Sequence, residues 1–355
     1  MTASAGTDIG IALDLAEGRI VGVRITPRRL PPIGALVAGR SAQDLLKLVP
    51  LLFTLCAAAH GIAAQTAVDA ARGIEVAPLV HRQRVAAALA ERLVEQLRSV
   101  VTVSRLLEQG QVAAAMRDVM RAAASFASAV SAAEPDRLGA IDLIERARDQ
   151  IGTAAVEHRL DDPASVRFSR SGAARLSIEN DLAIIARLVR EGMAYASTPD
   201  LGDVVPETGP WARAGAAEPR LADRPDTSAG RLQARLDETV VIARALRGLT
   251  IGEDDSSLTA VAFYRLGDGS GAAAVETARG RLYHHVELDA EGRVRRFQCL
   301  APTEWNFHPR GPLARMLRGA TVALDRGGRD AIERLIAAFD PCVGCKLTVR
   351  ELADA

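Results

Sequence analysis

Apolar residues recur every three or four positions through much of this chain between residues 41 and 189, a spacing that places them on one face of an α-helix. The clearest segment opens at Pro78, where Val85, Leu89 and Leu93 share one face and charged side chains occupy the others. A helical bundle is therefore expected in this part of the chain. The predicted helices cover about residues 41–52, 56–72, 78–100, 116–130, 141–151, 178–189 and 231–246.

The region near the N-terminus shows instead the two-residue alternation of β-strands. Residues 8–15 and 19–26 alternate in this way and are joined by a short turn, which predicts a hairpin. Four later segments separated by glycine-containing turns also look like strands, and short helices are expected after them. These strands cover residues 258–266, 271–277, 281–288 and 294–300, and the helices about 313–318 and 330–339. The predicted fold class is mainly α (α+β), with small β elements near the N-terminus and before the C-terminal end.

Proline content marks a break in this pattern, because residues 198–230 contain five prolines among glycines, alanines and scattered charges. Such a composition is typical of a linker or excursion. We expect a single domain over residues 1–355, with parts in chain order. These are a β-hairpin (1–30), a helical bundle (41–197), a proline-rich linker (198–230), and a final part with a helix, a β element and a cysteine motif (231–355).

Charge limits the possible partners. The chain has 44 Lys plus Arg and 44 Asp plus Glu, so it presents no dominant basic field to nucleic acid or to an anionic membrane. Residues 1–10 lack the basic start and apolar run of a secretory signal, and the most apolar window, residues 48–64, is short and interrupted by Pro50. Four unevenly spaced cysteines do not form a disulfide framework. We expect a cytoplasmic protein with neither nucleic acid nor membrane as a partner.

Two cysteines lie in the segment Asp340-Pro341-Cys342-Val343-Gly344-Cys345. A Cys-x-x-Cys pair places two thiolates on one turn, so zinc, iron and redox roles are all open. A second candidate is Cys56 with His60, because residues four apart share a helix face. In isolation these two are more often a small core residue and a hydrogen-bonded core histidine. The fourth cysteine, Cys299, lies in a predicted strand and is expected to serve packing.

Two further polar residues stand beside the C-terminal strands. Arg279 precedes a glycine at a strand end, which by default is a surface turn. Thr303 belongs to the segment Ala301-Pro302-Thr303-Glu304-Trp305-Asn306, where it would ordinarily cap a helix or turn, and a Pro-Arg pair ending at Arg310 follows.

Together these motifs resemble the large subunits of [NiFe] hydrogenases. That family carries Arg-x-Cys-Gly-x-Cys-x-x-x-His near its N-terminus and later an Ala-Pro-Arg-Gly loop. Pro-Ser/Thr-Thr-Trp-Asn, Pro-Arg and finally Asp-Pro-Cys-x-x-Cys-x-x-His follow. The likeness covers about residues 39–100 and 275–349, in the right order. It implies a reduced large-subunit helical bundle with both metal motifs at its centre.

The departures from that family point to a different role. Phe53 stands where the first N-terminal cysteine would be, while Cys56, Cys342 and Cys345 are kept. The resemblance implies that Cys56 and Cys345 are the two thiolates that would bind iron, whereas nickel has lost a terminal ligand. The family's proton-handling glutamate falls at Gly34, so turnover of hydrogen is not expected.

The outer shell of the site is also retained. His60 matches a residue that hydrogen-bonds a bridging thiolate, and Arg279 and Thr303 match donors that hold the cyanide ligands of the iron. Ala278 replaces the family's proline, and Thr348 stands at the terminal histidine that marks the protease cleavage site. With that histidine replaced, maturation by proteolysis is not expected.

This combination resembles the HupK/HoxV-type hydrogenase accessory proteins. The resemblance implies a maturation scaffold, not an enzyme, that holds or assembles the Fe(CN)2CO unit without nickel and transfers it to the hydrogenase large subunit precursor. HypC–HypD-type maturation factors are the implied partners. Two alternatives stay open: a structural zinc site of Cys56, His60, Cys342 and Cys345, and a metal-free large-subunit mimic that binds maturation partners.

Overall fold

The computed structural model describes residues 8–127, 136–158, 166–172, 174–217, 226–253, 256–323 and 325–352. The chain divides into two compact units, each assembled from separated segments. Unit 1 comprises Met1–Pro31, Leu160–Ala234 and Ala301–Ala355, and unit 2 comprises Pro32–Arg159 and Arg235–Leu300. The predicted parts 41–197 and 231–355 each contain residues of both units. The units differ from these parts because packing between segments distant in sequence determines which residues belong together.

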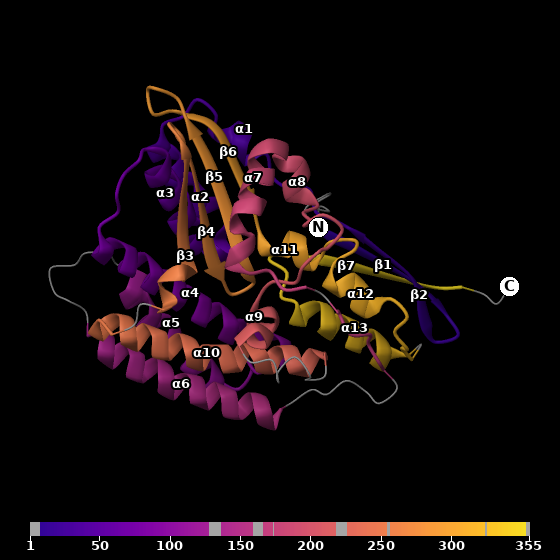
Figure 1. Cartoon of the computed structure of the whole chain (residues 1–355). Coiled ribbons are helices and arrows are strands. Elements are labelled where there is room, and N and C mark those ends of the chain that lie inside the picture. The colour runs from indigo at the N-terminus through magenta and orange to yellow at the C-terminus, as the bar shows by residue number, and fades with distance from the viewer. Residues whose placement is uncertain are drawn as a thin grey trace. The chain divides into compact units, whose positions relative to one another are not determined.

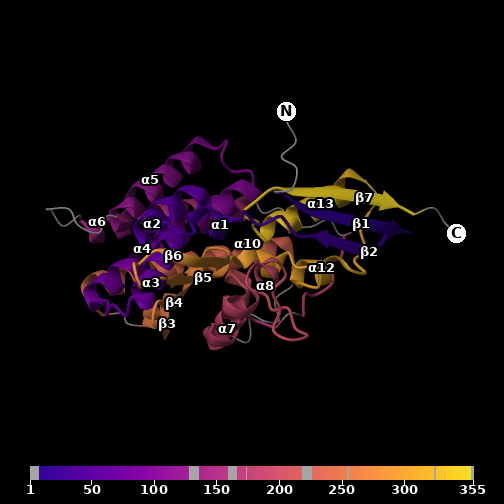
Figure 2. The ribbon, with the colours of Figure 1, turned by 90° about the horizontal axis from the view of Figure 1, so that it is seen from above.

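A three-stranded sheet organises unit 1. Strands β1 (Ile9–Ala16) and β2 (Arg19–Thr26) form the predicted hairpin, whose turn places Glu17 and Gly18 at φ angles of 50° and 71°. Strand β7 (Cys345–Glu351) runs parallel to β1 on its other side, as Figure 2 shows, with Cys345 opposite Ile9. The sequence did not predict β7.

One face of this sheet buries the core of unit 1. Alternate residues of β1, including Ile9, Ile11 and Leu13, belong to one cluster with residues of helices α12 (Pro312–Leu317) and α13 (Arg326–Ala338). These two helices lie close to the predicted ones. Among the described residues, the other helices of unit 1 are η2 (Ile178–Asn180), α7 (Asp181–Glu191), α8 (Met193–Ser197), α9 (Pro210–Ala217), α11 (Pro302–Asn306) and the first turns of α10 (Ser228–Ile251).

The proline-rich segment belongs to this unit, and the expectation of a linker is wrong for its described residues 198–217. Val205, Glu207 and Thr208 are buried, and the Glu207 backbone exchanges hydrogen bonds of 2.7 and 2.8 Å with Ala174 and Leu176. Prolines make the backbone irregular here, but irregular backbone can be buried when its polar groups find partners. Residues 218–225 lie outside the described part of the chain.

Unit 2 contains a four-stranded antiparallel sheet in chain order: β3 (Val261–Gly267), β4 (Ser270–Thr277), β5 (Gly280–Leu288) and β6 (Val294–Leu300). The predicted strands are confirmed to within a few residues. Helix α3 (Ala57–Ala71) lies along one face of this sheet (Figure 1). A Cβ atom at Gly271 would lie 2.3 Å from the backbone nitrogen of Ala71, so this approach requires glycine in β4.

The remaining helices of unit 2 confirm the predicted bundle. They are α1 (Ile33–Val37), α2 (Ala42–Leu52), η1 (Thr54–Cys56), α4 (Pro78–Val103), α5 (Gly110–Ala127), α6 (Arg137–Glu157), the rest of α10, and η4 (Ser256–Ala260). Ser41 caps α2 as expected, by accepting a hydrogen bond from the Asp44 amide. Helices α6 and α10 lie side by side (Figure 1), joined by a 2.8 Å ion pair between Arg247 and Glu145.

Helices α2 and α3 are the most apolar part of unit 2. Among the described residues, no single helix has the length and hydropathy to cross a membrane. Segments Ala42–Leu52 and Thr54–Ala71 meet that criterion only as a pair, which is bent by 98°.

Candidate functional site

Cys56 lies where the chain turns from α2 into α3. The short η1 turn ends at Cys56, which is the N-cap residue of α3 and is half-buried. Glu91 of α4 accepts hydrogen bonds from the amides of Ala58 and Ala59, at 2.7 and 2.9 Å. A carboxylate on the first amides of a helix satisfies donors that have no partner within the helix. Helix α4 therefore fixes the start of α3 and the position of Cys56.

His60 lies one turn further along α3 and is buried. One face of its imidazole is covered by the ring of Phe53, with ring centroids 3.6 Å apart. Its Nδ1 lies 2.9 Å from Nε2 of His284 on β5, and burial lowers the pKa of His284 to about 3. The ring of Phe297 on β6 packs edge-on against His284. The stacked ring of Phe53 thus fixes the plane of the His60 imidazole, and His284 contacts its Nδ1.

Arg279 is buried, and not part of a surface turn. It precedes Gly280 in the turn between β4 and β5, where Thr277 Oγ1 accepts the Arg279 amide hydrogen bond at 3.2 Å. Its Nη2 lies 3.1 Å from a carboxylate oxygen of Glu95 on α4. Glu95 is one helical turn from Glu91, which also feels the charge of Arg279. One face of α4 therefore brings the Cys56–Ala59 turn and Arg279 together in unit 2.

The pKa of Glu91 reflects its partial burial. Burial raises that pKa above its usual range, although the two amide hydrogen bonds and the charge of Arg279 act to lower it. Buried carboxyl groups take up protons more readily because the charged form is poorly solvated. Sequence reasoning missed Glu91, Glu95 and His284, since only the packing of α4 and β5 shows what they contact.

The other predicted residues lie in unit 1. Helix α13 ends at its C-cap Phe339, and Asp340 adopts a left-handed conformation (φ 54°) that turns the chain into the Cys-x-x-Cys segment. Cys345 then begins β7. Burial, with added effects of Asp8 and Cys342, raises the pKa of the Cys345 thiol to about 12.

Thr303 contacts this segment directly. It lies in α11, is buried, and donates a 3.2 Å hydrogen bond from Oγ1 to the sulfur of Cys342. The structure therefore groups Thr303, Cys342 and Cys345 in unit 1.

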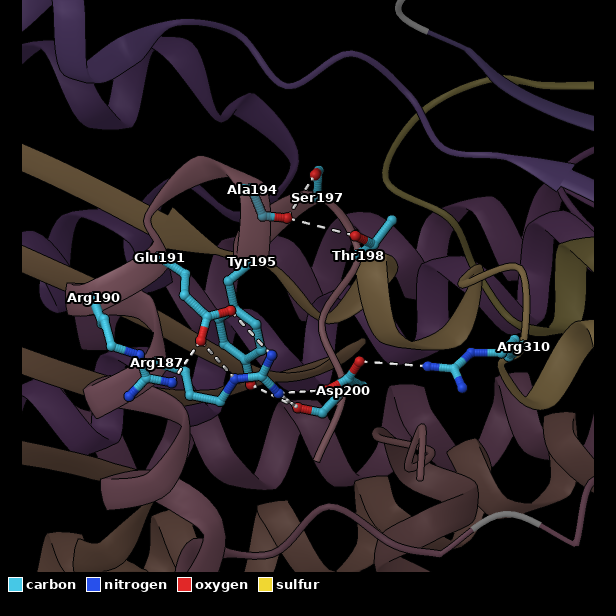
Figure 3. Close-up of polar contacts among 9 residues, drawn as sticks. All are labelled: Arg187, Arg190, Glu191, Ala194, Tyr195, Ser197, Thr198, Asp200 and Arg310. Atoms are coloured by element: carbon cyan, nitrogen blue, oxygen red, sulfur yellow. Dashed lines mark hydrogen bonds and ion pairs between the residues drawn. The ribbon is translucent and has the colours of Figure 1, made fainter. Parts of the chain in front are cut away.

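A polar network braces the segment that carries Thr303 and Arg310. Figure 3 shows Arg187 of α7 between Glu191 and Asp200, with Arg310 reaching the second oxygen of Asp200 at 3.4 Å. Tyr195 lies beneath the Arg187 guanidinium, 4.3 Å from ring centroid to Cζ, and its ring meets that of Trp305 edge-on. Trp305 and Arg310, two residues of the C-terminal motifs, are therefore held by contacts with Tyr195 and Asp200.

The four cysteines, all within the described residues, form no disulfide. Within each unit taken by itself, the described residues include no group of three or more His, Cys, Asp and Glu arranged to hold a metal ion. The candidate residues therefore form two sets. Cys56, His60 and Arg279 belong to unit 2, and Thr303, Cys342 and Cys345 to unit 1.

Comparison with known proteins gives the class of this fold. Residues 222–347 match the model of the nickel-dependent hydrogenase family. The chain superimposes on the reduced Ni-Fe-Se hydrogenase from D. vulgaris Hildenborough with a TM-score of 0.62 and 16% identity, over 92% of this chain and 94% of the other. The fold is that of a [NiFe]-hydrogenase large subunit, as the sequence predicted.

Full-length relatives are more specific. The chain is 43% identical to the hydrogenase expression/formation protein HupK of Bradyrhizobium diazoefficiens, over 100% of both chains. It is 30% identical to the hydrogenase expression/formation protein HoxV of Cupriavidus necator, over 87% of this chain and 88% of that protein. The chain belongs to the HupK/HoxV family of hydrogenase expression/formation proteins.

Proposed function

We propose that this protein acts in hydrogenase maturation as a scaffold, which holds or assembles the Fe(CN)2CO unit before its transfer to the hydrogenase large subunit precursor. The names of the relatives support the general role. In the proposal Cys56 and Cys345 are the thiolates on iron, and Cys342 is a third thiolate that accepts or releases it. HypC–HypD-type maturation factors would be partners, and hydrogen would not be turned over.

The observation that carries this proposal is the stacking of the Phe53 ring on His60. The position of the family's first cysteine is taken by Phe53, whose ring packs on His60 and has no atom that can ligate a metal. A soft thiolate set suited to low-spin iron is retained, while a terminal ligand of nickel is absent. The chain therefore keeps the means to hold the iron unit without those to complete a nickel–iron site.

The outer residues suit an anionic cargo. Arg279 is a buried cation in unit 2, and Thr303 is a buried hydroxyl donor in unit 1. Charge-assisted donors of this kind are the ones that bind anionic ligands most strongly. We propose that they hold the cyanide nitrogens once the iron unit is bound.

The cargo must also leave, and the Cys345 thiol offers a reason why it can. Its pKa of about 12 means that a proton competes with the metal for this sulfur near neutral pH. Weaker retention than in a finished enzyme is what a transfer scaffold requires.

Infrared spectroscopy of protein purified anaerobically from a hydrogenase-competent host tests the proposal. We expect cyanide and carbonyl stretching bands in the native protein and their loss in Cys56→Ala and Cys345→Ala. Cys299→Ala is the matched control, because Cys299 lies on β6 outside both candidate sets, and it should keep the bands. Absence of the bands from native protein would reject the scaffold, and one bound zinc per chain would then favour the structural zinc site.

A further inference from the structure

His60 and His284 form a buried pair whose proton arrangement matters for the proposed site. Both side chains are shielded from solvent, with exposed fractions of 2% and 0%. Only 2.9 Å separates Nδ1 of His60 from Nε2 of His284, so one nitrogen must carry a proton and the other must accept it. The pKa of His284, lowered to about 3 by burial, keeps this ring neutral near neutral pH.

Two arrangements satisfy a neutral pair. In the first, His60 donates from Nδ1, and His284 then carries its proton on its own Nδ1. That atom is buried and has no hydrogen-bond partner among the described residues. A buried donor without a partner is strongly disfavoured.

In the second arrangement His284 donates from Nε2 to Nδ1 of His60. The buried Nδ1 of His284 is then a bare lone pair, and unsatisfied acceptors are tolerated better than unsatisfied N–H groups. Neutral His60 must then carry its own proton on Nε2. The hydrogen bond made by one ring nitrogen in this way decides what the other nitrogen can do.

We propose that His284 is a positioning residue that holds His60 as its Nε2–H tautomer, so that His60 can donate a hydrogen bond to the iron-bound thiolate of Cys56. This inference rests on the proposed function. Cys56 is the N-cap residue of α3 and His60 lies one helical turn further along, which keeps the two residues near the same end of the helix. A thiolate accepts hydrogen bonds, which makes the Nε2–H form the one that can serve it.

The ring plane is fixed independently of the tautomer. Phe53 stacks on His60 with an angle of 6° between the planes, and Phe297 packs edge-on against His284 at 86°. Side chains from α2's end, α3, β5 and β6 thus hold the pair in one arrangement. Removing the His284 donor should therefore change the proton position more than the orientation of the His60 ring.

Nitrogen NMR of metal-free protein labelled with ¹⁵N-histidine measures the tautomer directly. We expect His60 of the native protein to show a protonated Nε2 and an unprotonated Nδ1. In His284→Leu the donor is lost and His60 should change to a mixture of tautomers, whereas His284→Gln keeps an N–H donor and should keep the native form. A protonated Nδ1 on His60 in the native protein would overturn the inference.

Infrared spectra of the iron-loaded protein test the consequence. Loss of a hydrogen bond makes a thiolate a stronger electron donor to iron, so the carbonyl band of His284→Leu should move to lower wavenumber and that of His284→Gln should return towards the native position. His285→Leu is the matched control. His285 is the next residue on β5, equally buried, and bonds Gln298 and Ser270 instead of His60.

The two proposals can fail separately. An unshifted carbonyl band in His284→Leu, or an equal shift in His285→Leu, would overturn the role of His284 while leaving the iron cargo intact. If native protein shows no carbonyl band, the cargo and the hydrogen bond to an iron-bound thiolate are both rejected. The NMR result on metal-free protein would still stand as a property of the histidine pair.

Discussion

The ring of Phe53 lies flat on the imidazole of His60, with centroids 3.6 Å apart and an angle of 6° between the planes. The resemblance to the large subunits predicts a cysteine at the position of Phe53, so in our proposal an apolar ring stands where a nickel ligand would be expected. Restoring that thiolate should create a nickel site if the remaining cysteines are available to a metal.

Phe53→Cys tests this directly. We expect the variant to bind Ni²⁺ at least about tenfold more tightly than native protein, which corresponds to ~1.4 kcal/mol. Anaerobic competition against a nickel chelator measures the difference. Phe53→Leu removes the stack without adding a thiolate and should bind nickel no better than the native protein. Equal affinities for the two variants would show that the missing thiolate is not what excludes nickel.

Asp8 and Cys345 lie at the adjoining ends of β1 and β7. Burial is the main cause that raises the pKa of Cys345 to about 12, and the negative charge of Asp8 is the next. Asp8→Asn should therefore lower the pKa and raise the thiolate fraction at any pH below it. Part of the gain in alkylation rate is offset because a less basic thiolate is less nucleophilic, so we expect a rise of about twofold or more.

Peptide-resolved mass spectrometry after brief iodoacetamide treatment measures that rate for Cys345 alone. Asp14→Asn is the control, because Asp14 lies on β1, the strand that Asp8 precedes, and forms an ion pair with Arg24 at 4.0 Å. Equal rates for native protein and Asp8→Asn, or equal acceleration by both substitutions, would contradict the assignment.

The helices and strands were predictable because their signals are local. The Ser41 cap, the hairpin turn at Glu17-Gly18 and the alternation in β1 each depend on residues close together in the chain. Strand β7 was missed because it depends on pairing with β1, more than three hundred residues away in sequence. A linker or excursion was expected at residues 198–230, but part of its described stretch is buried, because proline content predicts irregular backbone and such backbone can still be buried.

The candidate site could likewise be predicted only as far as local sequence signals reach. Motif spacing identified Cys56, His60, Arg279 and Thr303 as polar residues to examine, but not their partners. The Thr303 bond to Cys342 and the Glu95 ion pair with Arg279 join residues 39 and 184 positions apart. No periodicity in one sequence encodes such contacts, so these residues could be named and their surroundings could not.

Acid should destabilise the protein through His284. Its pKa is lowered to about 3 in the folded chain, against about 6.5 for an exposed histidine. Between these values the unfolded state binds a proton that the folded state does not, so the free energy of unfolding falls as pH falls through this window. The contribution is fully present above about pH 6.5, and its slope is at most about 1.4 kcal/mol per pH unit.

His284→Gln removes the titrating group and should flatten this part of the stability profile. Urea unfolding at a series of pH values between about 7 and 4 measures the slope. His158→Gln is the comparison variant, because it makes the same substitution at an exposed histidine that bonds Gln109. A native slope in His284→Gln would show that the acid sensitivity has another source.

Arg231 should contribute more to the stability of unit 1 than any surface ion pair. It is buried, donates to Glu207 and Asp226 at 2.5 and 2.8 Å, and lies 3.8 Å above the ring of Phe339, the residue directly before Asp340. Arg231→Met would leave two carboxylates without their cation, a loss of about 3–5 kcal/mol in the free energy of unfolding.

Guanidinium unfolding measures this loss, with Arg329→Ala as the control. The Arg329 pair with Glu333 is half-exposed on α13, so its loss should cost less than about 1 kcal/mol. Adding Glu207→Gln to Arg231→Met should recover part of the stability, because one uncompensated charge is removed. Equal losses in Arg231→Met and Arg329→Ala would mean that the buried network does not brace the chain before Cys342.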